Sequence, residues 1–569
     1  MTNKTLRRNT KRTLTHVGVL VGLLVYVPPL TATELVGKVV DSKTQEGLAA
    51  RIYIQDHQGK WIFVESADSR GTALPYREQW VPMPGSVEKH TTVSAHPFKV
   101  DLKPGTYTIT IERGKEYLPA EFELEVSGAR QEETFSLRRF ADYASLGWYS
   151  GETHVHRRIS ELPNVMLAED LNVAFPVTFW TTESDRVPNL LPSTLRRQGP
   201  SLFGNRVDLG AAPIRIDPSH VILPRNTEYE IFSVGDKRHV LGAVFILNHQ
   251  TRFDQTMPPV ADIARQAHKE GALLDLDKHS WPWSLMLVPV ADIDLFELSN
   301  NSVWRTQFGF RNSSVAPPEY MKIETNDGGM TEWGWIRYGL ETYYALLNCG
   351  FRLKPTAGTA SGVHPVPLGY SRVYVHIDGV FSVDKWLEGL KRGCSFVTNG
   401  PLLEAKINGE YPGSTFVSNK SVTLELKGSA AYWQPIERFE WIINGEVAGT
   451  FHPAGSSQDP KPPYFYEFKS QSIEISSSSW VALRAIRQSE SGRVQFAHTA
   501  PWFVDIRGTQ LLPKRVQIDF LIQRMKDELA RNQEVLEDDS LDEFRQALEV
   551  YETLRDQLDA AQHPSSEND

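Results

Sequence analysis

Near the N-terminus, hydrophobic and polar residues alternate with period two, the pattern of half-buried β-strands. The segment Leu102–Ile111 alternates in this way after a Pro-Gly turn, and the segments Val36–Asp41 and Ala50–Ile54 are shorter strand candidates. Turns separate these strands, and no long helical pattern interrupts them. We therefore predict a small β-sandwich over residues 34–138.

From about residue 139 to 400 the pattern changes, and apolar strand-length runs alternate with helical segments. Val240–Leu247, Leu273–Leu276 and Ile293–Leu298 are predicted strands, and Ala261–Glu270 is a predicted helix. Such alternation is typical of parallel strands joined by helical crossovers. In closed versions of this fold, functional side chains lie at the C-terminal ends of the strands.

Strand patterns return over residues 401–508, which predicts a second β-sandwich, and residues 509–569 form a helical tail. In the tail, apolar residues recur at spacings of three and four. They are Phe544, Leu548, Tyr551, Leu554 and Leu558. This stripe fits a helical hairpin packed on the body of the protein, or alternatively a dimer contact. The chain as a whole is predicted to be a multidomain α/β protein.

Residues 1–32 have the order of a secretory signal peptide: basic residues, the apolar run Val17–Val27, and small residues near Thr31. The apolar run is shorter than the roughly 20 residues that span a bilayer. We expect a periplasmic or secreted protein without a membrane span after cleavage. An uncleaved N-terminal anchor is the alternative.

Composition and charge argue against several classes of function. A net charge of -10 and a pI near 5.9 argue against nucleic acid as a partner. Walker-type and Rossmann glycine signatures do not stand out. Cys349 and Cys394 are the only cysteines, so the fold is not built on disulfides, although one bridge is possible. Cys349 lies in an apolar segment and is predicted to be a buried, inert thiol.

Several metal-ligand residue types lie at the ends of apolar runs in the α/β region. His154 and His156 are two residues apart, so on a strand they would face the same side. The others are Glu228, Glu230, His249, His279, Glu297 and His364. Neutral imidazoles and carboxylates are the usual ligands of Zn²⁺, Mn²⁺ or Fe. Their recurrence at strand ends predicts a divalent metal centre.

Two stretches resemble known families. The phrase LKPGTYTITIERG resembles carboxypeptidase-regulatory-like domains, which normally do no chemistry. Residues 139–400 resemble the polymerase-and-histidinol-phosphatase (PHP) superfamily, specifically its carbaryl-hydrolase-like branch of secreted metallohydrolases. The matching phrases are GWYSGETHVHR, VFILNHQ, GALLDLDKHSWPW, LLNCGFRLKPTAGT, GYSRVYVH and GCSFVTNGPLL. This resemblance implies a distorted (β/α)7 barrel with a metal cluster that hydrolyses phosphate esters or ester-like and carbamate bonds.

Carried over to this chain, the resemblance makes His154 and His156 the first paired ligands. It makes Glu228, or less favourably Glu230, the bridging carboxylate. The later strand-end ligands would be His249 and His279.

The chain departs from the family pattern at two places. Phe179 and Trp180 replace polar ligands after the second strand, and these rings would either narrow the pocket or simply pack in the barrel. In the late loop, Ala360 and Gly362 stand where an Asp and a His are expected. His364, two residues on, is the candidate replacement. One or two bound ions are therefore expected rather than three.

Two functions follow from these residues. The first is a secreted metal-dependent hydrolase of ester, carbamate or phosphoester bonds, in which Arg157 and Arg372 hold an anionic substrate group. Alternatively, these arginines are solvated on the surface or form structural ion pairs. The second function is a degenerate barrel that serves as a non-catalytic scaffold binding glycans or a cell surface. No partner protein is indicated.

Overall fold

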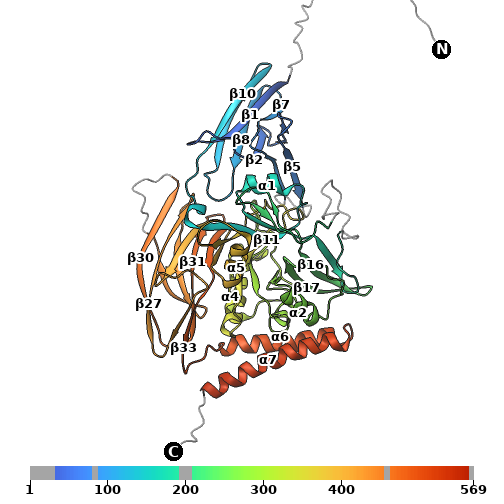
Figure 1. Cartoon of the computed structure of the whole chain (residues 1–569), viewed down its shortest axis with the longest axis vertical. Helices are drawn as coiled ribbons and strands as arrows, with labels where there is room; N and C mark the ends of the chain where they lie inside the picture. The colour runs from blue at the N-terminus through green and yellow to red at the C-terminus, as the bar shows by residue number, and fades with distance from the viewer. Residues whose placement is uncertain (1–31, 80–86, 191–207, 454–461, 563–569) are drawn as a thin grey trace, which may run out of the picture.

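The computed structural model describes residues 32–79, 87–190, 208–453 and 462–562. Figure 1 shows an N-terminal β region at one end, a central α/β region, a C-terminal β region beside it, and two long helices across the opposite end. The signal peptide predicted over residues 1–32 falls almost wholly on residues 1–31, outside the described residues. Within the described part, no helix has both the length and the apolar character to cross a membrane.

The N-terminal region consists of two β-sheets around a shared apolar core. In β8 the side chains of Tyr107, Ile109 and Ile111 are buried and the residues between them are less so, as period-two alternation predicts. The sheets have the orders β10-β1-β7-β4 and β5-β6-β2-β8-β9, with β3 on β2. The strands are β1 (Thr33–Asp41), β2 (Ala50–Asp56), β3 (Trp61–Ile62), β4 (Glu65–Ser66), β5 (Ala73–Gln79), β6 (Val87–Val93), β7 (Phe98–Leu102), β8 (Gly105–Glu112), β9 (Ala120–Val126) and β10 (Arg130–Leu137).

The central region contains a six-stranded sheet of order β13-β16-β17-β18-β19-β22. Every residue of β18 and β19 is buried, as expected for parallel strands covered on both faces. The strands are β13 (Phe179–Glu183), β16 (Thr227–Val234), β17 (Lys237–Leu247), β18 (Leu273–Leu276), β19 (Leu295–Ser299) and β22 (Lys354–Ala357). The helices are η1 (Ala144–Leu146), α1 (Leu162–Glu169), α2 (Ala261–Lys269), α3 (Ser284–Ala291), η2 (Glu319–Met321), α4 (Glu332–Asn348) and α5 (Val383–Arg392), and β20 (Thr325–Asn326) and β21 (Gly329–Met330) form a small hairpin.

The second central sheet continues into the C-terminal β region as one twelve-stranded sheet. The junction is the antiparallel pairing of β24 with β32, so the predicted boundary at residue 400 crosses a continuous sheet. The strands on the central side are β11 (Trp148–Val155), β12 (Val173–Pro176), β14 (Ile214–Arg215), β15 (Val221–Ile222), β23 (Arg372–His376) and β24 (Ser395–Thr398). Those beyond the junction are β26 (Thr415–Ser418), β28 (Arg438–Ile443), β29 (Glu446–Phe451), β31 (Ser479–Gln488), β32 (Val494–Thr499) and β33 (Trp502–Ile506), while β25 (Leu402–Ile407), β27 (Val422–Tyr432) and β30 (Tyr464–Ile475) form a separate sheet.

The architecture is therefore multidomain and mixed α/β, as predicted. A closed (β/α)7 barrel is not shown by the sheet order, because the central strands belong to two sheets and several of them pair antiparallel. Both sheets contribute to one large hydrophobic core.

The tail forms two long helices, α6 (Arg515–Asn532) and α7 (Asp538–Gln562), which pack against α3 and the main core. The Tyr551 hydroxyl donates to the Leu285 carbonyl oxygen at 2.6 Å. The Glu543 carboxylate accepts from the backbone N–H groups of Val260 and Ala261 at 2.7 Å, where α2 begins. The apolar stripe of α7 thus packs on the body of the protein.

Both cysteines are free and buried, so they form no bridge with each other. Burial raises the pKa of the Cys394 thiol to about 11 and that of Cys349 further. This agrees with the prediction of an inert thiol at Cys349.

Candidate metal centre

The paired histidines lie at the end of β11 and face the same side, as their spacing predicts. His154 is on β11 and His156 is the first residue after that strand. Both side chains are buried. Their ring centroids are 5.1 Å apart, and His154 Nε2 lies 3.1 Å from His156 Nε2. Burial lowers the pKa of each imidazole to about 3, so both rings are neutral and able to offer a lone pair.

Glu228 completes a first group of possible ligands with these two histidines. It lies on β16, and its Oε2 is 3.3 Å from His156 Nε2. One ligand atom from each of the three residues falls within 4.8 Å of the others. Glu230, two residues later on the same strand, is not in this group within the described residues. The structure therefore brings Glu228 to the paired histidines.

A second group uses the other side of the His154 ring. His154 Nδ1 lies 3.3 Å from both carboxylate oxygens of Glu297 and 3.6 Å from Asp277 Oδ1. Glu297 is on β19, and Asp277 directly follows β18, the neighbouring parallel strand. Asp277 is absent from the predicted candidates, whereas Glu297 is one of the strand-end candidates but not one of the ligands that the resemblance implies. Asp277 follows β18 directly and Glu297 lies within β19, and every residue of both strands is buried, so the signal in the sequence is a carboxylate next to buried apolar residues.

Lys278 supplies the positive charge within this buried cluster. Its Nζ lies 2.7 Å from Asp277 Oδ2 and 3.0 Å from Oδ1. Burial alone would raise the pKa of Asp277, but the Lys278 ammonium and His154 outweigh it and hold that pKa below its usual range. Burial raises the pKa of Glu228 to about 7 and that of Glu297 well above its usual range. The cluster thus holds more buried carboxylates than nearby cations.

The loop after β22 closes over the histidines. The Ala360 N–H donates to the His154 carbonyl oxygen, and the His156 N–H donates to the Ser361 carbonyl oxygen, each at 2.9 Å. A Cβ at position 358 would collide with the His154 and Glu297 side chains, so only glycine fits there. The backbone of the loop at Gly358, Ala360 and Ser361 therefore packs directly against the centre.

The other predicted histidines lie outside both groups among the described residues. The His249 ring bonds to the Thr227 hydroxyl at 2.8 Å and to the Thr251 carbonyl oxygen at 2.6 Å. His279 is buried against Tyr338 and Trp335, at centroid distances of 4.5 and 5.0 Å. His364 lies beside Phe310 and Trp304, at 5.8 and 6.1 Å.

The two predicted substrate-binding arginines make structural contacts. Arg372 is buried and donates to the carbonyl oxygens of Gly369, Glu169 and Asp170, at 2.6 to 3.1 Å. The Arg157 guanidinium pairs with Glu161 at 2.9 Å and lies over the Tyr76 ring.

Trp180 and Phe179 each lie beside one of the candidate histidines. The Trp180 ring contacts the His156 ring at a centroid distance of 4.8 Å, and Phe179 lies 6.1 Å from the His249 ring. Trp180 therefore forms an apolar wall directly beside the first ligand group.

The donor set fits a divalent transition metal. Two neutral imidazoles and a carboxylate are typical ligands of Zn²⁺, Mn²⁺ and Fe. In the described part of the chain, Glu228 Oε2 is buried and accepts no hydrogen bond. A buried carboxylate oxygen of this kind ordinarily has a hydrogen bond or a cation as its partner.

Comparison with known proteins leaves the family open. No family model matches the chain, and no curated protein does. Among solved structures, it is similar to a two-domain protein containing a predicted PHP-like metal-dependent phosphoesterase from Bacteroides vulgatus ATCC 8482. The match has 12% sequence identity and a TM-score of 0.25, and it covers 59% of this chain and 90% of that chain. A likeness at this TM-score establishes neither a shared fold nor a shared activity.

Proposed function

We propose that the protein is a secreted metal-dependent hydrolase of ester, carbamate or phosphoester bonds. The observation that supports it is the buried convergence of His154, His156 and Glu228, which come from strands far apart in the sequence. Burying these polar groups costs free energy that apolar residues would not, so packing alone does not account for them.

The His154 ring has two nitrogens but ordinarily offers a metal only one. Its Nε2 faces His156 and its Nδ1 faces Glu297 and Asp277. We therefore assign one cation to the group of His154 Nε2, His156 and Glu228. Glu297 then accepts a hydrogen bond from the Nδ1–H group of His154, which fixes the ring orientation and strengthens Nε2 as a ligand.

A divalent cation held there would supply a water of lowered pKa and polarise the oxygen of the scissile bond. The chain itself contributes the orientation of His154 through Glu297, and the charge of Lys278, which keeps Asp277 ionised. Trp180, packed on His156, keeps bulk water from one side of the cluster and favours an apolar leaving group.

Metal analysis of the purified mature chain tests this proposal, combined with turnover of aryl ester, aryl carbamate and aryl phosphate substrates. We expect about one transition-metal ion per chain and turnover that a chelator abolishes. The His154→Ala variant should lose the metal and more than about 100-fold of the activity, since even residues that only orient a ligand contribute 10–100-fold. His57→Ala, at an exposed histidine, is the matched control.

Wild-type protein without stoichiometric metal would contradict the proposal, as would equal metal content in His154→Ala. Metal binding without turnover of any of these substrates would instead support the non-catalytic scaffold.

A further inference from the structure

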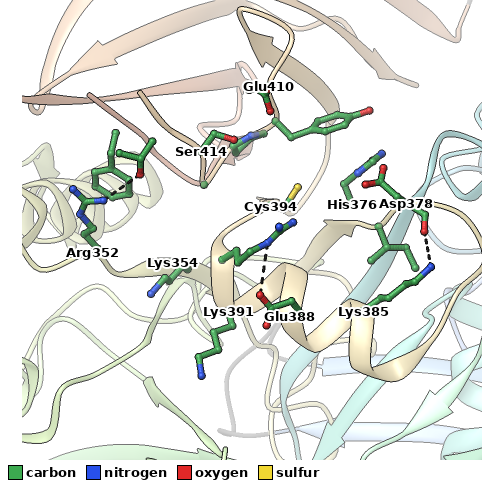
Figure 2. Close-up of a pocket in the computed structure, with 17 residues that line it drawn as sticks. Arg352, Lys354, His376, Asp378, Lys385, Glu388, Lys391, Cys394, Glu410 and Ser414 are labelled. Carbon is green, nitrogen blue, oxygen red and sulfur yellow. Dashed lines mark hydrogen bonds and ion pairs between the residues drawn. The ribbon is translucent and has the colours of Figure 1, made fainter. Parts of the chain in front are cut away.

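A cavity of about 690 Å³ lies where the C-terminal β region meets the α/β region (Figure 2). Its walls are α5, the start of β22, the end of β23 and the loop 410–415. None of the candidate metal ligands lines it. Its volume falls within the range of small-molecule sites, about 300 to 1,000 Å³.

The lining of this cavity is rich in basic residues, although the chain has a net charge of -10. Five Lys and Arg residues line it, against three acidic residues. The basic residues are Arg352, Lys354, Lys385, Lys391 and Arg392, and the acidic ones are Asp378, Glu388 and Glu410. In Figure 2, Arg352 and Lys354 lie at one end, and His376, Asp378 and Lys385 lie at the other.

At the first end, the positive charge is only partly neutralised. One guanidinium nitrogen of Arg352 donates to both carboxylate oxygens of Asp505, at 2.8 and 2.9 Å. Arg392 has only a 3.9 Å contact with Glu388. Among the residues that the structure describes, Lys354 has no carboxylate oxygen within the 4.0 Å limit of an ion pair.

Lys354 is the half-buried member of this group. Burial lowers the pKa of its ammonium. The carboxylates of Asp294 and Asp292 raise this pKa, and the neighbouring Lys391 and Arg352 lower it. Lys391 and Arg352 add positive charge beside the Lys354 ammonium, and a bound anion would offset it.

The walls of the cavity are held in place by backbone contacts. A Cβ at Gly413 would collide with the Arg392 carbonyl, so the loop and the end of α5 touch through their backbones. The Trp502 indole N–H donates to the Glu410 carbonyl oxygen at 3.0 Å, and the Phe503 N–H donates to that of Ser414 at 2.9 Å. A ligand would thus meet a preformed site rather than a loop that must order on binding.

We propose that this cavity binds a small ligand through an oxyanion group, a carboxylate or a phosphate, held by Lys354, Arg352 and Arg392. Ammonium and guanidinium groups are the side chains that recognise both oxyanions. The site is separate from the metal centre and does not depend on the function proposed for it.

Calorimetric titration of the full chain with inorganic phosphate and, separately, with citrate tests the site. We expect saturable 1:1 binding of at least one probe, and the preferred probe identifies the oxyanion. Affinity should fall at least about tenfold in Lys354→Met, which keeps the apolar stem of the side chain, and in Arg392→Gln. Lys420→Gln, an exposed lysine on another turn, controls for net charge.

The titration is repeated with His154→Ala, which separates this site from phosphate bound at the metal centre. Unchanged affinity in His154→Ala supports the cavity as the site. Absence of saturable binding for both probes would overturn the proposal. So would equal affinity in wild type, Lys354→Met and Arg392→Gln.

Discussion

His154 contacts possible partners through both of its ring nitrogens. Nε2 lies 3.1 Å from His156 Nε2, and Nδ1 lies 3.3 Å from Glu297. With one nitrogen bound to the proposed cation, the other would be protonated and would need an acceptor. Glu297 is the residue placed to be that acceptor, which makes it a positioning residue rather than a ligand.

Substitution of Glu297 by Gln should weaken metal binding without abolishing it. The amide keeps the shape of the side chain but provides a poorer acceptor for the Nδ1 proton. We expect a loss of about 10–100-fold in metal affinity, measured by competition with a chromogenic chelator. Asp275→Asn is the matched control, because Asp275 is also buried but bonds to Thr356. An equal loss in both variants would show a general structural effect instead.

His249→Gln should leave the metal content unchanged, although the sequence alone makes His249 a ligand candidate. Its ring already bonds to Thr227 and to the Thr251 carbonyl oxygen. Breaking these bonds should lower the free energy of unfolding by about 1–3 kcal/mol, which chemical denaturation measures. Loss of metal in this variant would show that the ring turns toward the centre when the ion binds.

At the scale of elements, the sequence predicts the paired histidines well, because strand periodicity alone places residues 154 and 156 on one face. It does not predict the meeting of Asp277 and Glu297, because that depends on β18 and β19 being parallel neighbours. Nor does it predict the position of His249. Asn248 has a positive φ of 55°, so the chain turns just before the histidine.

Tyr76, from β5 of the N-terminal region, hydrogen-bonds to the loop that closes over the candidate metal centre. Its hydroxyl donates to the carbonyl oxygens of His364 at 2.7 Å and Val366 at 3.0 Å. This loop also pairs with the end of β11, through Ser361 and His156. The N-terminal region is therefore joined to the candidate site by direct contact.

The Tyr76→Phe variant should lower both stability and metal affinity. It removes the donor from buried carbonyl oxygens, at a cost of about 1–3 kcal/mol in the free energy of unfolding. We expect several-fold weaker metal binding because the loop backbone supports His154 and His156. Tyr107→Phe is the control, since its hydroxyl also donates to a carbonyl oxygen, that of Lys103, but within the N-terminal region. Equal metal affinity in both variants would contradict the role of Tyr76.

At the scale of the whole molecule, the regions are joined by strand pairing and ion pairs that the local sequence pattern does not predict. The twelve-stranded sheet runs from the α/β region into the C-terminal β region through β24 and β32. On the other side, Arg51 of β2 pairs with Glu169 of α1 at 3.0 Å, and Arg305 pairs with Glu88 of β6 at 3.1 Å. The three regions are therefore joined by a shared sheet and by ion pairs between buried or partly buried side chains.

The β32 strand also places a buried histidine between the regions, and this gives the stability of the fold a defined pH dependence. His498 bonds to the Tyr344 hydroxyl of α4 at 2.8 Å and to the Thr499 carbonyl oxygen at 2.6 Å. Burial, with the nearby Arg484 guanidinium, lowers its pKa from 6.5 to about 3. Below pH 6.5 the unfolded chain takes up a proton at this residue, and the folded chain does so only near pH 3. This group therefore removes stability as the pH falls through that window.

Replacing His498 with Gln should remove the loss of stability at low pH that this histidine causes. Gln can still bond to Tyr344 but does not titrate, so the difference in unfolding free energy between wild type and variant should narrow as the pH falls. Between pH 7.5 and 5.5 we expect it to narrow by about 1.4 kcal/mol, the value of one pH unit of proton uptake by the unfolded chain. Urea denaturation at both pH values, on metal-free protein, measures it. His57→Gln, at an exposed position, is the control for composition. A constant difference between wild type and His498→Gln would show that the His498 ring takes up its proton over the same pH range in the folded and unfolded chains, and that the contact between β32 and α4 tolerates a buried charge.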